Sequence, residues 1–159
     1  MATLQQLYEL YDAYEKKAEK VRSKASRFAG AFNLGDDPRR HECHEQFYDD
    51  VEDWVSAFLK EDPSQQEISA AAHWLLETAA AHRDEDVYWY LYAIHAHTKP
   101  LIPRLEKEDC RKLLEMYDST YPVLDRLPAQ QEVYRLLKKQ SGTKETGDRK
   151  NKLLSFFRK

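Results

Sequence analysis

Histidine and glutamate residues at helical spacing are the strongest candidates for chemistry in this sequence. Residues 41–45 read His-Glu-Cys-His-Glu, so that His41, His44 and Glu45 stand at positions i, i+3 and i+4. These positions share one face of a helix, where imidazole and carboxylate groups can ligate a metal ion together. His73 and Glu77 repeat the His-x-x-x-Glu spacing. The pattern indicates a metal-binding helical bundle with ligands on two facing helices.

The same residues have a second interpretation that needs no metal. The Glu-x-x-His pairs of di-metal bundles are missing from the sequence. A His and a Glu four residues apart are also common on solvated helical faces. In this interpretation His44 fills a position in an apolar seam, while His41 and Glu45 face solvent. We favour this interpretation and keep the metal site as the alternative.

The sequence lacks the motifs of several common enzyme classes. Glycine occurs only at positions 30, 35, 142 and 147, which leaves no glycine-rich phosphate loop and no dinucleotide fingerprint. There is also no nucleophile elbow and no Cys-x-x-Cys pair. We therefore expect a non-enzymatic protein without a cofactor.

The remaining histidines and the two cysteines suggest structural roles. His95 and His97 fall in the last turn of a predicted helix before Pro100, where a cation suits the helix dipole. Their spacing of two residues directs them to different sides of that helix. Cys43 and Cys110 form no disulfide framework, and we expect reduced thiols, with Cys110 in the core, in a cytoplasmic protein.

Residues 87–94 form a strongly apolar run without a charge or a helix breaker and read VYWYLYAI. Three acidic residues precede the run and His95, His97 and Lys99 follow it, which is the charge order a helix dipole favours. We predict a buried helix at the centre of the fold. Its Tyr88, Trp89 and Tyr92 allow two interpretations, since such residues fill cores and also dominate protein interfaces.

A second candidate contact surface lies near the end of the sequence. Residues 140–152 are polar and broken by glycine, and we predict a linker there. An isolated apolar cluster follows it, made of Leu153, Leu154, Phe156 and Phe157. Docking peptides are presented in this way. Two alternatives stay open: the segment packs back onto its own domain, or it anchors to anionic lipid through its flanking Lys and Arg residues.

Residues 150–157 resemble the short peptides that bind sliding clamps. In the eukaryotic and archaeal form of that motif, Leu153 matches the aliphatic position and Phe156-Phe157 match the aromatic pair. Lys150 stands where that form has glutamine. In the bacterial form of the motif, the matching residues are Leu154, Ser155 and Phe157. Phe156 stands where that form has leucine, and Leu153 stands where it has glutamine. The resemblance implies a protein partner for this segment.

His41, His44 and Glu45, the first candidate metal ligands, lie on the second of two long predicted helices. Apolar residues from Leu4 to Phe28 recur at alternating spacings of three and four, a heptad seam over four repeats. A second helix, from Pro38 to about Leu59, carries a seam of the same spacing. Because the connection between them is short, we predict a long antiparallel coiled-coil-like hairpin. Such a seam can equally pair with a second copy, so a homodimer stays open.

The rest of the chain predicts further helices and no strands. Helix start and stop signals delimit segments at about 64–81, 107–119 and from Pro128 onward. We predict an all-α bundle of six or seven helices over residues 1–139, followed by the linker and tail of residues 140–159. No segment predicts a signal peptide or a transmembrane helix.

Charge narrows the range of partners. The net charge is −3 and the pI about 6.1, which argues against broad nucleic-acid binding because that requires a basic face. The tail leaves peripheral membrane contact open. We predict a non-enzymatic protein-interaction or adaptor module, with residues 88, 89 and 92 and the tail cluster as its contact surfaces.

Overall fold

The computed structural model describes residues 2–29, 38–81, 94–121 and 126–143, without the side chains of residues 22–29, 38–41 and 81. The described residues form helices and no strands, which confirms the all-α bundle. Residues 94–98 are also helical. The elements with defined bounds are α1 (Leu4–Ala29), α2 (Pro38–Lys60), α3 (Gln65–Ala81), the 3₁₀ helix η1 (Ile102–Arg104), α5 (Lys107–Thr120) and α6 (Pro128–Ser141).

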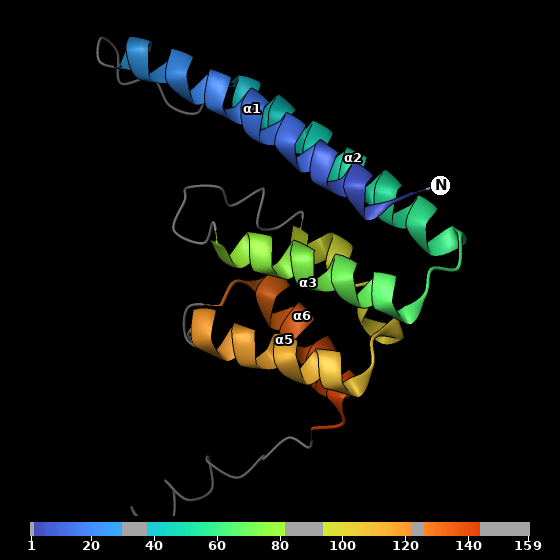
Figure 1. Cartoon of the computed structure of the whole chain (residues 1–159). Coiled ribbons are helices and arrows are strands. Elements are labelled where there is room, and N and C mark those ends of the chain that lie inside the picture. The colour runs from blue at the N-terminus through green and yellow to red at the C-terminus, as the bar shows by residue number, and fades with distance from the viewer. Residues whose placement is uncertain (1, 30–37, 82–93, 122–125, 144–159) are drawn as a thin grey trace, which may run out of the picture.

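The helices form stacked layers. Helices α1 and α2 lie side by side in one layer, α3 lies next to that layer, and α5 and α6 lie beyond α3 (Figure 1). Trp74 of α3 joins the first two layers, since its ring centroid lies 4.9 Å from that of Tyr8 and 5.5 Å from that of Tyr11. Apolar side chains from all layers form one buried core.

The seams of α1 and α2 bury part of what the heptad pattern predicts, since Leu4, Tyr11, Ala18 and Val21 are only partly buried. Leu7 and Val51 have no exposed surface and Tyr14 is buried. Thr3 contacts Trp54, and Tyr14 contacts Phe47. Residues 30–37, which connect the helices, lie outside the described residues, so the coiled-coil hairpin as a unit stays a prediction.

Helix α3 begins at the predicted capping box. The backbone N–H of Glu67 donates to Ser64 Oγ at 3.3 Å, and Glu67 Oε2 accepts the backbone N–H of Ser64 at 2.8 Å. The hydrogen bond from the Ser64 side chain also lowers the pKa of Glu67. One broad apolar face of α3 is buried in the core. Its residues are Ile68, Ala71, Ala72, Leu75, Leu76 and Ala79.

The expected role of His95 and His97 as cations at a helix end is wrong for His97. It is 5% exposed and stacks edge-on against Tyr48 of α2, with ring centroids 4.3 Å apart. Burial lowers the pKa of His97 to about 4, so the ring is neutral near pH 7. His95 instead lies against Tyr117 and Tyr121, which confirms that the two rings point apart.

Only the end of the predicted central helix, residues 87–94, can be placed. Its last residue, Ile94, has no exposed surface. The other seven residues lie outside the described part of the chain, as does the tail at 144–159. Helix α6 continues to Ser141, two residues past the predicted domain boundary, and Gly142 follows it with a φ of 70°. This left-handed backbone favours glycine, a common way to end a helix.

A buried arginine joins α5 to the start of α6. Arg126 donates from Nε to the carbonyl of Tyr121 at 3.0 Å and from Nη2 to Asp118 Oδ1 at 2.7 Å. Its guanidinium lies 4.0 Å above the ring of Tyr134. On the same pair of helices, Cys110 is fully buried, which raises the pKa of its thiol to about 11 and confirms a core role.

None of the helices in the described part of the chain combines the length and the apolar character that crossing a bilayer requires.

Candidate functional site

The structure places His44 in the α1–α2 interface. Its Nδ1 lies 2.9 Å from the hydroxyl of Tyr14, and the two rings are tilted with centroids 5.7 Å apart. His44 is partly buried, whereas the neighbouring Glu45 is exposed. The side chain of His41 lies outside the described residues. A seam position for His44 and a solvated position for Glu45 are what the metal-free interpretation expects.

The second half of the predicted metal set lies on α3. His73 Nδ1 is 3.3 Å from Glu77 Oε1, and the Glu77 side chain is 63% exposed. Within the described ranges, no three His, Cys, Asp or Glu side chains gather as metal ligands. The structure therefore gives the metal-binding alternative no assembled site, and the role of His41 stays a prediction.

The predicted protein-contact residues cannot be examined. Tyr88, Trp89 and Tyr92 fall within residues 82–93, and Leu153, Leu154, Phe156 and Phe157 fall within residues 144–159. Both ranges lie outside the described residues.

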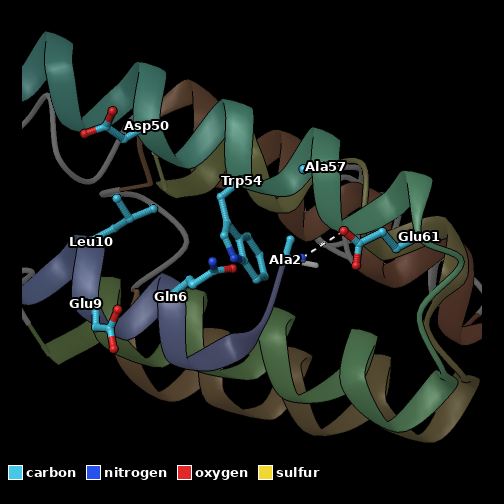
Figure 2. A pocket seen from close by; sticks show the side chains of 8 residues that line it. All are labelled: Ala2, Gln6, Glu9, Leu10, Asp50, Trp54, Ala57 and Glu61. Atoms are coloured by element: carbon cyan, nitrogen blue, oxygen red, sulfur yellow. Dashed lines mark hydrogen bonds between the residues drawn. The ribbon is translucent and has the colours of Figure 1, made fainter.

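A groove between α1 and α2 is a site that the sequence interpretation did not include (Figure 2). It has a volume of about 520 Å³. Its lining combines apolar side chains with three carboxylates and one amide: Ala2, Gln6, Glu9, Leu10, Asp50, Trp54, Ala57 and Glu61.

Helical periodicity explains why these residues meet. Gln6 and Leu10 lie four residues apart on α1, and Ala2 precedes that helix. Asp50, Trp54 and Ala57 follow intervals of four and three on α2, and Glu61 comes directly after that helix. Residues at such spacings share one helical face, so two stripes on neighbouring helices line one groove.

Hydrogen bonds between the two helices hold the wall of the groove in place. The indole Nε1 of Trp54 donates to the backbone carbonyl of Thr3 at 3.0 Å. The backbone N–H of Ala2 donates to Glu61 Oε1 at 2.9 Å, as Figure 2 shows. Thr3 and Gln6 also form a reciprocal cap, in which the N–H of Thr3 donates to Gln6 Oε1 at 2.9 Å and the N–H of Gln6 to Thr3 Oγ1 at 3.3 Å. The walls are thus fixed without a bound partner.

Two carboxylates of the groove accept hydrogen bonds from neutral amide side chains. Glu9 Oε1 accepts a hydrogen bond from the amide of Gln5 at 3.0 Å, and Asp50 Oδ1 accepts one from the amide of Gln46 at 2.8 Å. An amide orients a carboxylate but does not neutralise it. No Lys or Arg among the described residues forms an ion pair with Glu9 or Asp50.

The acidic character extends beyond the groove. Residues 2–15 contain three acidic side chains and no Lys or Arg, and residues 49–61 contain five acidic side chains with Lys60 as the only basic one. The basic residues of α1 begin at Lys16. This end of the α1–α2 layer therefore has a negative potential that favours a cationic ligand.

Two signals in the sequence point to the groove in retrospect. Leu10 is a large apolar residue one position before the seam residue Tyr11, and it has no partner in the heptad pattern. The basic residues of α1 all lie in its second half, which separates charge along the helix. Neither signal shows which residues of α2 lie opposite Leu10. The groove forms only because these residues of α2 face Leu10 across the interface.

No protein-family model, curated protein or solved structure matches this chain.

Proposed function

We propose that this chain is a non-enzymatic protein-interaction module that binds a basic, amphipathic peptide segment in the α1–α2 groove. The observation that carries the proposal is a groove with apolar lining whose Glu9 and Asp50 form no ion pair with a Lys or Arg of the described residues. Leu10 and Ala57, next to the buried ring of Trp54, offer surface for one or two apolar side chains of a ligand. Glu9 and Asp50 lie where Lys or Arg side chains beside those apolar groups would meet them.

Physical arguments favour a peptide over other ligands for this groove. The groove is open and elongated between two helices, the form in which helical proteins receive a peptide. Its negative charge disfavours nucleic acid and anionic lipid, both of which require basic surfaces. It also offers no buried nucleophile or general base among its lining residues, which supports binding rather than catalysis.

The proposed setting is the cytoplasm. Cys43 and Cys110 are both buried and unpaired in the structure. Free thiols fit a reducing compartment. The contact surface expected at residues 88, 89 and 92 stays a separate prediction.

Fluorescence anisotropy with the full chain tests the proposal. The probe is a labelled synthetic peptide of leucine and phenylalanine flanked by lysines, with a sequence not taken from this protein. We expect saturable binding that weakens as added salt screens the charges. Glu9→Gln/Asp50→Asn should weaken it by roughly 5- to 10-fold, since two exposed charge pairs contribute about 1 kcal/mol together. Ala57→Trp should block binding by filling the groove.

A matched control carries the same charge change elsewhere. Glu45→Gln/Glu115→Gln removes two exposed carboxylates that do not line the groove. This variant should bind the probe within about twofold of the wild type, because its groove is intact. Equal weakening by both double variants would show attraction by net charge alone and would refute a groove site. Absence of binding to the wild type would also refute it.

A further inference from the structure

We propose that residues 149–159 of this chain are themselves a ligand of the α1–α2 groove and compete there with other peptides. This inference rests on the proposed function, because it names an occupant and a regulation for the same groove. The segment reads Arg-Lys-Asn-Lys-Leu-Leu-Ser-Phe-Phe-Arg-Lys. It has five basic residues, no acidic residue, and four large apolar residues between the basic ones.

The chemistry of the segment complements that of the groove. The groove offers apolar surface at Leu10 and Ala57, next to the buried ring of Trp54, together with the carboxylates of Glu9 and Asp50. Phe156 and Phe157 can fill the apolar part while Lys150 and the other basic residues meet the carboxylates. Electrostatic complementarity of this kind selects partners and sets their orientation.

The length of chain that follows α6 bears on whether the segment reaches its own groove. The last described residue is Thr143, just after α6, in the layer farthest from α1 and α2 in Figure 1. Packed helices lie about 8–10 Å apart, so two layer spacings amount to roughly 20 Å. The ten residues from 144 to 153 span up to about 33–36 Å when extended. The extended segment is therefore longer than the separation of the layers, and the cross-linking experiment below tests whether it reaches the groove around them.

Docking within the chain would regulate the groove. A ligand tethered through a short connection has an effective concentration in the millimolar range. Even a segment with modest intrinsic affinity then occupies the groove for much of the time. A peptide from another protein must displace this segment. Its apparent affinity is therefore its intrinsic affinity multiplied by the fraction of molecules whose groove is free.

Zero-length carbodiimide cross-linking of the full chain, followed by mass spectrometry, tests the inference directly. The reagent joins a lysine amine to a carboxylate with which it is in contact. We expect links from Lys150, Lys152 or Lys159 to Glu9, Asp50 or Glu61. Phe156→Ser/Phe157→Ser should remove these links although it retains every lysine, because the apolar contacts are lost.

Isotope labelling separates docking within a chain from docking between chains. After cross-linking of an equal mixture of ¹⁵N-labelled and unlabelled protein, the two peptides of each linked pair should carry the same isotope. Mixed-isotope pairs as abundant as single-isotope pairs would show docking between chains and would overturn the inference. Links from the three lysines only to carboxylates outside the groove would also overturn it.

The anisotropy probe provides the second readout and keeps the two proposals separate. Phe156→Ser/Phe157→Ser should bind the probe about tenfold more tightly than the wild type, since the competing segment is removed. Equal affinity for both proteins, with binding still reduced by Glu9→Gln/Asp50→Asn, would refute the inference and leave the proposed function standing. Probe binding to neither protein would refute the proposed function, and the cross-links would then decide the inference by themselves.

Discussion

The indole Nε1 of Trp54 donates a 3.0 Å hydrogen bond to the backbone carbonyl of Thr3, across the interface between the end of α2 and the start of α1. The Trp54 ring also stacks on Phe58, with centroids 4.7 Å apart. One side chain therefore fixes the start of α1, continues the apolar seam and forms a wall of the groove. The fold and the candidate site share this residue, so their stabilities are linked.

Trp54→Phe should lower the free energy of unfolding by about 1–3 kcal/mol, because it removes the indole hydrogen bond and leaves a small cavity. Chemical denaturation followed by circular dichroism measures the change. The matched control is Trp74→Phe, which keeps the aromatic contacts with Tyr8 and Tyr11 in a partly exposed position. The control should lose clearly less stability. If both variants lost equally, the Trp54–Thr3 bond would have no special role.

Val51→Asp should destabilise the chain by several kcal/mol or prevent folding, because Val51 is fully buried and an unpaired carboxylate would be desolvated there. Ser56→Asp places the same charge at an exposed position of α2 and should change stability by no more than about 0.5 kcal/mol. Thermal melting compares the two. A Val51→Asp protein that melts with the wild type would contradict the seam as the contact between α1 and α2.

The buried ring of His97 should make stability depend on pH. Its folded pKa of about 4 lies below the value of 6.5 for a solvated histidine. As the pH falls, His97 therefore takes up a proton in the unfolded chain before it does so in the folded chain. The contribution of the neutral ring to stability is fully present above pH 6.5 and is lost between pH 6.5 and 4. The loss is on the order of 3 kcal/mol.

His97→Phe isolates this effect from the titration of carboxylates in the same range. The variant keeps a ring against Tyr48 and has nothing to protonate. The stability difference between wild type and variant should change between pH 7 and pH 4, in the direction that favours the variant at low pH. A difference that stays constant with pH would show that His97 does not titrate in this way.

Arg126→Lys should cost about 1–2 kcal/mol in spite of the retained charge. The guanidinium donates to the Tyr121 carbonyl and to Asp118 while it covers the ring of Tyr134. A lysine ammonium cannot reproduce that planar geometry. Arg111→Lys is the control, since the side chain of Arg111 is 55% exposed and pairs only with Glu108 on the surface. Denaturant unfolding should show little change for the control, and equal effects would contradict a structural role for Arg126.

Local rules of sequence predicted most of the helices. The reciprocal pair of Ser64 and Glu67 marks a helix start by contacts only three residues apart, and it lies where the pattern indicated. Likewise Pro128 begins α6 and the heptad spacing selected Leu7 and Tyr14 as buried. Such predictions succeed because the contacts that decide them lie within a few turns of the chain.

The tertiary structure alone decided which surfaces meet. Helical spacing shows that His95 and His97 point apart, but only packing against Tyr48 shows that His97 is buried and therefore neutral. The groove is a similar case: Leu10 and Ala57 lie on faces that no local rule pairs. Side-chain burial and charge environment depend on contacts between residues far apart in the chain. The sequence by itself thus determined the helices and their apolar faces, while the layer packing decided that His97 is buried against Tyr48 and where the acidic groove formed.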